Sequence, residues 1–372
     1  MKINIANAGK IFKRLRLDFI GFTIASILKK SEKPIRIPNS IDKLRLIHSD
    51  DGKSSITENE IDTDPQYDIQ VIMPVYNTEK MLKQAIESVL NQEGNLRILL
   101  VIINDGSPDK SSEILTEYEC RPNVHIINQN NKGFSGARNS GLRKIQAKYI
   151  TFVDSDDYLS PNALRALFKS AETYNSEIVQ GSYSLFTDGA KTKYIKFPNL
   201  SKDAKLTGYP WGKLFKSHLF QRICFPEGYW FEDTIMSWLL YPLTPDSKKT
   251  SISDIVYNYR INPNGITMTA QHNKKVIDTI WVCLKIFSDR ENIGLPLEPK
   301  EYEKFLRQAL LNVQRIYQYG DIETTKIAFS AMNEIRLLFF KQMPAPKNKL
   351  RYLHNTLESN CFRSFLFAGG LI

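Results

Sequence analysis

Three carboxylates stand within four consecutive positions, at Asp154, Asp156 and Asp157. Like charges at this spacing repel one another, so the cluster is costly unless a cation neutralises it. Carboxylate oxygens suit Mg²⁺ or Mn²⁺, and such an ion commonly bridges to phosphate oxygens. The spacing therefore indicates a site for a metal ion and a diphosphate, although a solvated turn before a helix capped by Ser160 would account for the same residues.

Another acidic residue, Asp105, lies in the turn Asn104-Asp105-Gly106-Ser107. Asp-Gly turns often do no more than reverse the chain. An aspartate at the rim of a sheet would also accept a hydrogen bond from a nucleotide base or ribose. Both interpretations stay open on these residues alone.

The segment Gly133-Phe134-Ser135-Gly136-Ala137-Arg138 is expected to open a helix. Glycines permit close approach of the backbone, and the N-terminus of a helix favours an anion, to which Arg138 adds a fixed positive charge. The spacing is neither a dinucleotide fingerprint nor a Walker loop.

The pair Glu232-Asp233 follows two aromatic residues, Trp230 and Phe231. Burial beside aromatic rings raises the pKa of a carboxyl group and suits it to general-base catalysis. An acidic pair that stabilises the N-terminus of a helix explains the same residues.

Short apolar segments alternate with helical patterns through the middle of the chain. Strands are predicted at 69–73, 98–103, 124–127 and 149–153, with Pro74 ending the first, and helices at 79–90, 109–119 and 137–145, with Thr78 capping the first. This alternation predicts a parallel sheet with both faces covered. Because ligands bind beyond the carboxyl ends of such strands, Asp105 and Asp154 are expected at one rim of the sheet.

Segments of a different character flank this region. Residues 10–30 form a basic, partly amphipathic helical pattern, in which one face is expected to hold Ile11, Leu15, Phe19, Phe22 and Ser26. The segment 49–64 is polar and acidic, as expected of a linker. We expect a basic extension and linker at 1–66, an α/β domain at 67–270 and a helical domain at 271–372.

The net charge of +10 suits a polyanionic partner such as nucleic acid, an anionic membrane or a phosphate-bearing substrate, although solubility alone would explain it. No recognition helix or RNA-binding signature is visible, so a nucleic-acid partner is not expected.

The four cysteines lack metal or redox spacing, which favours reduced thiols in a cytosolic protein. No apolar run reaches the roughly 20 residues of a membrane span, and no signal peptide is recognisable.

Taken in order, these segments resemble the family 2 glycosyltransferases, which have the GT-A fold, a Rossmann-like, mostly parallel sheet flanked by helices. The resemblance covers about residues 68–178. Its matching segments are Val71-Ile72-Met73-Pro74-Val75-Tyr76-Asn77, Ser88-Val89-Leu90-Asn91-Gln92, Asn104-Asp105-Gly106-Ser107-Pro108-Asp109, Asn131-Lys132-Gly133-Phe134-Ser135-Gly136-Ala137-Arg138-Asn139-Ser140-Gly141 and Phe152-Val153-Asp154-Ser155-Asp156-Asp157. A looser match continues through Trp211-Gly212-Lys213 to Glu232-Asp233, and Pro108 departs from the threonine that is usual there.

The resemblance implies a role for each matching residue. Pro74 and Tyr76 would line the nucleoside pocket, Asp105 would contact the base, and Arg138 would lie near the nucleotide. Asp154 and Asp156 correspond to the D-x-D motif, with Asp156 the preferred metal ligand and Asp157 close by.

The looser match implies further roles. Asp233 corresponds to the catalytic base, with Glu232 as the alternative. Lys213 and Arg260 are candidates for binding the donor, the latter because Tyr257-Asn258-Tyr259-Arg260 resembles a segment near the diphosphate. Candidates for stacking on sugar rings are Trp211, Trp230 and Trp238.

The resemblance implies an inverting transfer of a sugar from a nucleotide-sugar, with a UDP-sugar as the default, in the presence of Mn²⁺ or Mg²⁺. The acceptor would be a hydroxyl of a glycan or lipid-linked glycan in cell-surface polysaccharide synthesis. The protein would be cytoplasmic, with residues 10–30 as a candidate for peripheral binding to the inner, anionic face of the cell membrane.

Two alternatives remain. A sugar-1-phosphate nucleotidyltransferase should carry a glycine-rich, basic loop after the first strand, where this chain has Pro74-Val75-Tyr76-Asn77. A non-catalytic binding or scaffold protein could keep the same fold. The intact Asp154, Asp156 and Asp233 argue against that alternative without excluding it.

Overall fold

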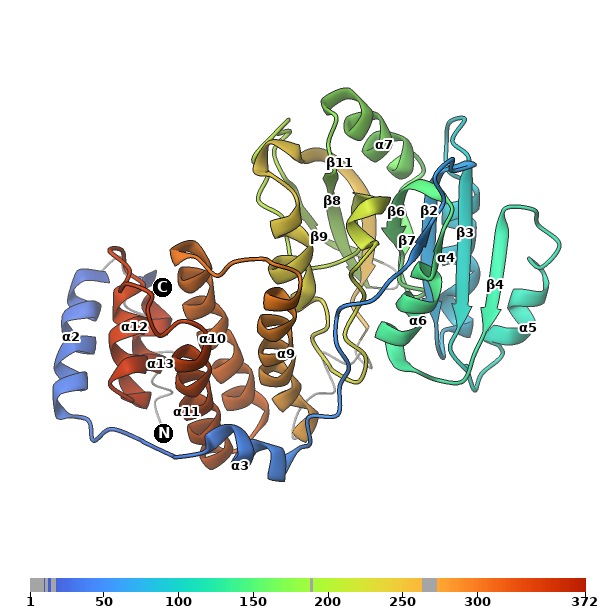
Figure 1. Ribbon diagram of the computed structural model, residues 1–372. Helices are drawn as coiled ribbons and strands as arrows, with labels where there is room; N and C mark the ends of the chain where they lie inside the picture. The colour runs from blue at the N-terminus through green and yellow to red at the C-terminus, as the bar shows by residue number, and fades with distance from the viewer. Residues whose placement is uncertain (1–9, 11–12, 15–17, 188–189, 263–272) are drawn as a thin grey trace. The chain divides into compact units, whose positions relative to one another are not determined.

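The computed structural model describes residues 10, 13–14, 18–187, 190–262 and 273–372. The chain divides into two compact units (Figure 1). The sheet unit is Gly52–Gly265, and the helical unit combines Met1–Asp51 with Ile266–Ile372. The domain boundaries expected after residues 66 and 270 stay a prediction.

The sheet unit is built on one large mixed sheet. In the described part of the chain its strand order is β4-β3-β2-β6-β10-β8-β11-β7, and β9 pairs with β8. The strands are β2 (Tyr67–Val75), β3 (Ile98–Asn104), β4 (Val124–Asn128), β6 (Ala147–Phe152), β7 (Tyr158–Leu159), β8 (Ile178–Thr187), β9 (Ala190–Ile195), β10 (Lys213–Lys216) and β11 (Lys249–Arg260). A separate parallel pair joins β1 (Glu60–Ile61) to β5 (Lys144–Ile145).

Strands β4, β3, β2 and β6 run parallel, as the alternating pattern predicts. Beyond them, β10 lies antiparallel to both β6 and β8. Strand β11 then runs parallel to β8 and carries the short β7 antiparallel at its far side. The two ends of the sheet thus have different topologies, and the acidic cluster lies between β6 and β7.

Strand β2 does not end at Met73, as expected, but continues through Pro74 to Val75. The carbonyl of Ile72 accepts a hydrogen bond from the amide of Val153 (3.1 Å), so this side of β2 faces β6. Pro74 is two residues after Ile72, so its backbone nitrogen points to the same side of β2, toward β6. The pairing of β2 with β6 stops at Phe152, the partner of Ile72. No ladder hydrogen bond is therefore lost when proline lacks an amide hydrogen.

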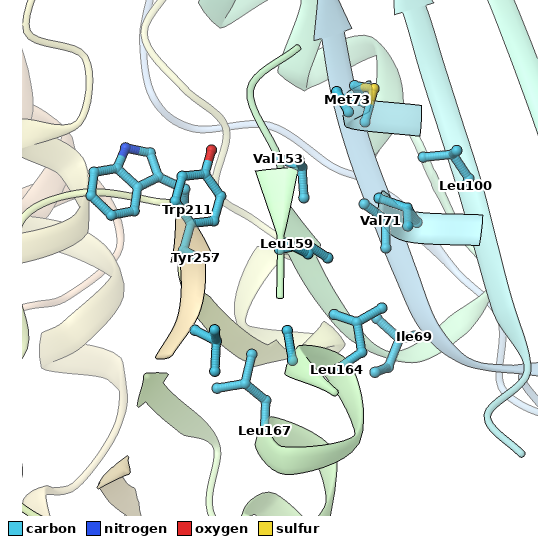
Figure 2. Close-up of a cluster of buried hydrophobic side chains, with 14 of the residues drawn as sticks. Ile69, Val71, Met73, Leu100, Val153, Leu159, Leu164, Leu167, Trp211 and Tyr257 are labelled. Carbon is cyan, nitrogen blue, oxygen red and sulfur yellow. The ribbon is translucent and has the colours of Figure 1, made fainter. Parts of the chain in front are cut away.

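Helices cover both faces of the sheet. The hydrophobic core on one face joins Ile69, Val71 and Met73 of β2 to side chains of α4 (Glu79–Leu90), α5 (Ser111–Thr116) and α7 (Ala163–Tyr174). Figure 2 shows these residues of β2 with Leu164 and Leu167 of α7. On the other face α6 (Gly133–Leu142) packs against β2 and β3. A side chain at Gly141 would meet Ile72 at 2.6 Å, so glycine allows this close approach.

Two predicted helices have bounds that differ from those expected. The helix expected at 109–119 begins at Ser111, since Oδ2 of Asp109 accepts a hydrogen bond from the amide of Glu79 (2.8 Å) at the start of α4. In return, Oε2 of Glu79 accepts from the amide of Lys110 (2.9 Å). The helix expected at 137–145 begins earlier, at Gly133, and ends at Leu142, where the chain turns into β5.

Thr78 and Ser160 were expected to cap helices with their hydroxyl groups, but neither α4 nor α7 has a side-chain cap hydrogen bond. Both hydroxyl groups have other partners. Thr78 precedes α4, but its hydroxyl donates to Oγ of Ser155 (3.1 Å) in the acidic loop. Helix α7 begins at Ala163 rather than Pro161, and Oγ of Ser160 accepts a hydrogen bond from Asn258 (3.2 Å) of β11. The hydroxyl groups thus hold loops together across the sheet.

The later part of the sheet unit contains short helical turns. They are η1 (Ser217–Phe220), the π-helical turn η2 (Met236–Leu240), η3 (Tyr241–Leu243) and η4 (Asp246–Lys248). Turn η2 follows Glu232-Asp233 directly and buries Trp238 completely. Trp238 is therefore a core residue, and its candidacy for stacking on a sugar ring was wrong.

The helical unit consists of α2 (Asp18–Ser31), α3 (Ser40–Ile47), η5 (Lys274–Ile277), α9 (Asp278–Asn292), α10 (Pro299–Tyr319), α11 (Ile322–Phe339), α12 (Arg351–Glu358) and α13 (Phe362–Leu371). Helix α2 packs on α12 and α13, and α3 packs on α11. In the described part of the chain, every helix is too short or too polar to cross a bilayer.

The predicted basic helix is observed as α2, together with helical residues 10 and 13–14. Phe22 is buried, as expected, but Ser26 is exposed and donates its hydroxyl to the carbonyl of Phe22 (3.0 Å). Ile11, Leu15 and the side chain of Phe19 lie outside the described residues.

Candidate active site

The acidic loop joins β6 to β7 at the carboxyl end of β6. Its last member, Asp157, is buried against β11. One carboxylate oxygen accepts a hydrogen bond from the hydroxyl of Tyr257 (2.8 Å), and the other accepts from the amide of Arg260 (2.7 Å). Asp157 therefore fastens the loop to β11.

The loop concentrates negative charge in a poorly solvated place. Burial raises the pKa of Asp157 well above its ordinary value, and the charges of Asp156 and Asp154 raise it further. Burial, followed by the charge of Asp154, likewise raises the pKa of Asp156. Burial and mutual repulsion thus disfavour the ionised forms of Asp156 and Asp157.

Two hydrogen bonds hold the backbone of this loop. The amide of Asp154 donates to the hydroxyl of Tyr257 (3.1 Å). The carbonyl of Asp156 accepts from Nε of Arg260 (2.8 Å), whose Nη2 also reaches Oε1 of Gln84 (2.7 Å). Arg260, the last residue of β11, therefore lies against the acidic loop.

Arg138 joins the acidic loop to the segment around Glu232. It projects from α6, is 6% exposed, and packs near the rings of Phe134 and Phe225. Its Nη2 lies 2.9 Å from Oδ1 of Asp154, and its Nη1 lies 2.6 Å from Oε1 of Glu232. Burial disfavours the guanidinium charge, but Asp154 and Glu232 outweigh it and raise the pKa of Arg138.

Glu232 and Asp233 lie in a tight turn that leads into η2. The preceding residue, Phe231, has a φ of 63°, in the left-handed region that side chains usually avoid. Its carbonyl accepts a hydrogen bond from the amide of Thr234 (3.1 Å). Burial, opposed by the charge of Arg138, raises the pKa of Glu232 to about 7.

The two carboxylates of this turn differ in exposure. Glu232 is buried and paired with Arg138, whereas Asp233 is only half-buried. The carbonyl of Asp233 accepts a hydrogen bond from the amide of Met236 (2.9 Å). Glu232 and Asp233 therefore also lie at the start of a helical turn, which is the other explanation considered for this acidic pair. The more accessible carboxylate is Asp233.

Lys213, at the start of β10, is fully buried near this turn. Its ammonium group donates to Oγ1 of Thr207 and to the carbonyl of Tyr209, both at 2.7 Å. Burial lowers the pKa of Lys213 to about 7, although the negative charge of Asp233 opposes that shift. Lys213 is thus electrostatically linked to Asp233.

The residues expected around the nucleoside lie at the carboxyl ends of β2 and β3. Pro74 is half-buried, and Tyr76 is 50% exposed. Asp105 is buried, and its Oδ1 accepts from Nε2 of Gln129 (2.6 Å) and from the amide of Lys132 (2.9 Å). Asp105 therefore fixes the start of α6, whatever else it binds.

The carboxyl ends of β3 and β6 meet at β2, as topology predicts. The amide of Asp105 donates to the carbonyl of Val75 (2.9 Å), and the amide of Val153 donates to Ile72. Asp105 and Asp154 therefore follow strands on either side of β2, at the same rim of the sheet.

Comparison with known proteins places this arrangement in a family. The model of "Glycosyl transferase family 2" matches residues 70–221. Glycosyltransferase GlyG of Streptococcus pneumoniae serotype 4 is 30% identical over 249 residues, which cover 61% of this chain and 82% of GlyG. The chain belongs to glycosyltransferase family 2.

Two further similarities describe the extent of the match. Glycosyltransferase GlyA of the same organism is 30% identical over 271 residues, 66% of this chain, but the match spans only 38% of GlyA. The solved structure of residues 1–349 of Staphylococcus aureus TarS in complex with UDP-GlcNAc matches with a TM-score of 0.63 and 19% identity, covering 80% of this chain and 89% of that one. The fold is therefore GT-A, as the sequence resemblance implies.

The three carboxylates of the acidic loop differ in exposure. Asp154 and Asp156 are half-buried, whereas both oxygens of Asp157 accept hydrogen bonds from the protein. Among the described residues, no three His, Cys, Asp or Glu side chains are arranged to hold a metal ion by themselves. The raised pKa values of Asp156 and Asp157 mark a loop in which a neutralising cation would be favourable.

The sequence alone missed Tyr257 as a site residue. Its hydroxyl bridges Asp157 and Asp154, and its ring stacks on Trp211 with centroids 4.6 Å apart (Figure 2). Trp211 stacks in turn on Tyr209, also at 4.6 Å. The sequence signal that could have indicated Tyr257 is the alternation of Tyr257 and Tyr259 along β11. This alternation does not show which of the two rings contacts the acidic loop.

Proposed function

We propose that this chain is an inverting, metal-dependent glycosyltransferase that uses a UDP-sugar as its donor. One observation carries the proposal: Arg138 bridges Asp154, in the acidic loop, and Glu232, next to Asp233. The motif proposed to hold the donor is thus joined through Arg138 to Glu232, the residue before the proposed base. The similarity of the fold to TarS in complexes with UDP-GlcNAc and UDP supports the choice of donor.

On the donor side, Asp156 and Asp154 are proposed to hold Mg²⁺ or Mn²⁺. The bound cation would neutralise the charge that develops on the departing diphosphate, which is worth several kcal/mol in such reactions. Tyr76 and Pro74 are proposed to line the nucleoside pocket, with Asp105 at the base. Asp157 instead holds the loop through Tyr257 and Arg260.

Arg138, Arg260 and Lys213 are proposed to have different roles in the site. Arg138, already paired with two carboxylates, is proposed to position Asp154 and the turn at Glu232 rather than to contact phosphate directly. Arg260, whose guanidinium lies against the backbone of Asp156, is proposed to lie near the diphosphate. Lys213 is proposed to act through its buried charge near Asp233.

On the acceptor side, Asp233 is proposed to remove the proton of the attacking hydroxyl. The hydroxyl oxygen forms a bond to C1 of the sugar, the bond from C1 to the diphosphate breaks on the opposite face, and the anomeric carbon inverts. Asp233 suits this role better than Glu232, because Glu232 is buried and its carboxylate is held by Arg138.

The acceptor is proposed to be a growing glycan, free or lipid-linked, of a cell-surface polysaccharide. A cytoplasmic location at the inner face of the cell membrane is proposed with it. Cys120, Cys224, Cys283 and Cys361 are free thiols, which suits a reducing compartment.

The substitution Asp233→Asn tests the base directly. We expect the rate of sugar transfer to fall by about 10²–10⁴-fold, because general-base catalysis contributes that much. The Kd for UDP, measured by calorimetry, should change little.

Asp254→Asn is the matched control, because Asp254 is an exposed carboxylate of β11. It should leave both transfer and UDP binding unchanged. Transfer at the wild-type rate in Asp233→Asn would refute the assignment of the base.

A further inference from the structure

Helix α2 is fixed to the helical unit through one face. Phe22 stacks on Tyr352 of α12, with ring centroids 4.2 Å apart. Gly21 lies so close to Leu371 of α13 that a side chain at Gly21 would meet it at 2.5 Å. This face of α2 is therefore part of the unit's core.

The residue that follows α2 fastens it further. The carboxylate of Glu32 accepts hydrogen bonds from the amides of Arg363 (2.6 Å) and Ser364 (2.9 Å), at the start of α13. An acidic side chain at the N-terminus of a helix is favourable for the helix dipole. Helix α2 is thus held in a defined orientation, and its opposite face points outward.

The outward face of α2 is apolar. Ile20, Ile24, Ile27 and Leu28 follow the spacing i, i+4, i+7, i+8, which places them on one stripe of a helix. Ile20 is 48% exposed, Ile27 61% and Leu28 36%. Aliphatic side chains at the spacing of a packed helix face are thus presented to solvent, which marks an interaction surface.

Positive charge lies at the C-terminal end of this stripe. Lys30 is in the last turn of α2, Lys33 and Arg36 follow the helix, and all three are exposed. The sequence from Ile20 to Ser31 contains no Asp or Glu. The carboxylate of Glu32 is engaged at the start of α13, so it does not offset these charges.

The excess of positive charge in this chain comes from the helical unit, to which α2 belongs. Of the 50 Lys and Arg residues, 26 lie in the helical unit with 15 of the 40 Asp and Glu residues. The helical unit therefore has a formal charge of +11 and the sheet unit a charge of −1. The basic pI is a property of the helical unit, not of the proposed catalytic sheet.

We propose that the outward face of α2 is an interfacial anchor that lies in the surface of an anionic phospholipid bilayer. The aliphatic stripe enters the boundary between headgroups and acyl chains, while Lys30, Lys33 and Arg36 contact lipid phosphates. The anchor deepens the proposed location at the membrane and does not depend on the proposed transfer reaction.

Two other occupants of this face fit the observations less well. A soluble phosphate polymer would satisfy the cations but would leave Ile20 and Ile27 exposed to water. A second copy of the chain would cover the stripe but would bring two units of charge +11 together, which is unfavourable.

The test is co-sedimentation of the full chain with vesicles of phosphatidylcholine, with and without about one third phosphatidylglycerol. Wild type should bind the anionic vesicles, and binding should weaken at high salt because the charges are screened. The double variant Ile20→Glu/Ile27→Glu should lower the partition coefficient at least about tenfold, because two aliphatic contacts are lost and two like charges face the lipid.

The matched control is Leu243→Glu in the sheet unit, where Leu243 is 39% exposed. It should bind as wild type does. A second variant, Lys30→Glu/Lys33→Glu, keeps the apolar stripe and should also bind more weakly, and the far-ultraviolet circular dichroism of each variant should match that of wild type.

Three results would overturn the proposal. The first is no binding of wild type to anionic vesicles, including the case in which it binds soluble polyphosphate instead. The second is equal binding by Ile20→Glu/Ile27→Glu and the control. The third is a dimer that this double variant dissociates while vesicle binding stays unchanged, since the face would then be an interface between copies.

Discussion

The carboxylates of the candidate site are distinguished by their neighbours rather than by their residue type. Asp157 is held by Tyr257 and the amide of Arg260, so it shapes the acidic loop. Glu232 is held by Arg138. Asp156 and Asp233 are half-buried and differ in location, one in the D-x-D motif and one beside η2. This difference supports the proposed division between metal binding and base catalysis.

The residue types of this site could be found from the sequence, because the D-x-D motif and Glu232-Asp233 are local in the chain. The bridge by Arg138 could not, since its partners Asp154 and Glu232 lie 16 and 94 residues away. Lys213 was a candidate for binding the donor by resemblance, and no local pattern indicated that its ammonium group is buried. Only the packing of β10 shows this.

Lys213 should make the stability of the sheet unit depend on pH. Its pKa is about 7 in the folded protein and near 10.5 in an ordinary lysine, so between these values the unfolded chain binds more protons. Raising the pH through this range therefore favours the native state, by up to about 1.4 kcal/mol per pH unit. Below about pH 7 both states are protonated and the contribution is constant.

Urea denaturation at neutral pH and at about pH 9 measures this effect. We expect Lys213→Met to remove most of the rise in unfolding free energy that wild type shows. Lys216→Met, on the same strand, serves as the control because Lys216 is only half-buried. The same pH dependence in Lys213→Met and wild type would contradict the assignment of a buried, readily deprotonated lysine.

At the level of elements, the parallel strands and their covering helices were predictable because their apolar patterns are local and nearly continuous. The antiparallel insertion of β10 between β6 and β8 was not predicted, because a four-residue strand has no distinctive pattern. The ends of α5 and α6 also differed from expectation. Asp109, for example, was expected to begin α5, but its carboxylate accepts a hydrogen bond from the amide of Glu79 at the start of α4.

The close packing of α6 on the sheet gives a test at this scale. A side chain at Gly141 would lie 2.6 Å from Ile72 and 3.0 Å from Ile103. Overpacking of this kind costs about 1–3 kcal/mol, whereas alanine gains up to about 1 kcal/mol in helix propensity. Gly141→Ala should therefore lower the free energy of unfolding, measured in urea.

Gly208→Ala is the control for that experiment, because a side chain at Gly208 would meet no atom within 4 Å. It should be close to neutral. If Gly141→Ala were as stable as Gly208→Ala, α6 would not be packed on β2 and β3 as closely as described.

At the level of the whole molecule, composition alone showed an excess of positive charge but not where it lies. The grouping of the N-terminal residues with the C-terminal helices assigns the excess to one unit. That grouping depends on contacts between segments more than 300 residues apart, such as those between Glu32 and Ser364, which no local pattern predicts. The sheet unit, close to neutral, contains all the candidate site residues.

The reaction proposed for this chain is the transfer of a sugar from a nucleotide donor with the help of a divalent cation at Asp154 and Asp156. The most direct measurement is the release of UDP from a panel of UDP-sugars, with Mn²⁺ or Mg²⁺, after treatment with EDTA, and in the variant Asp156→Asn. We expect UDP to be released from at least one donor. Release should be lost with EDTA, recovered when the cation is restored, and lost in Asp156→Asn. Release that is unaffected by EDTA and by Asp156→Asn, or no release from any donor in the panel, would contradict the proposed reaction.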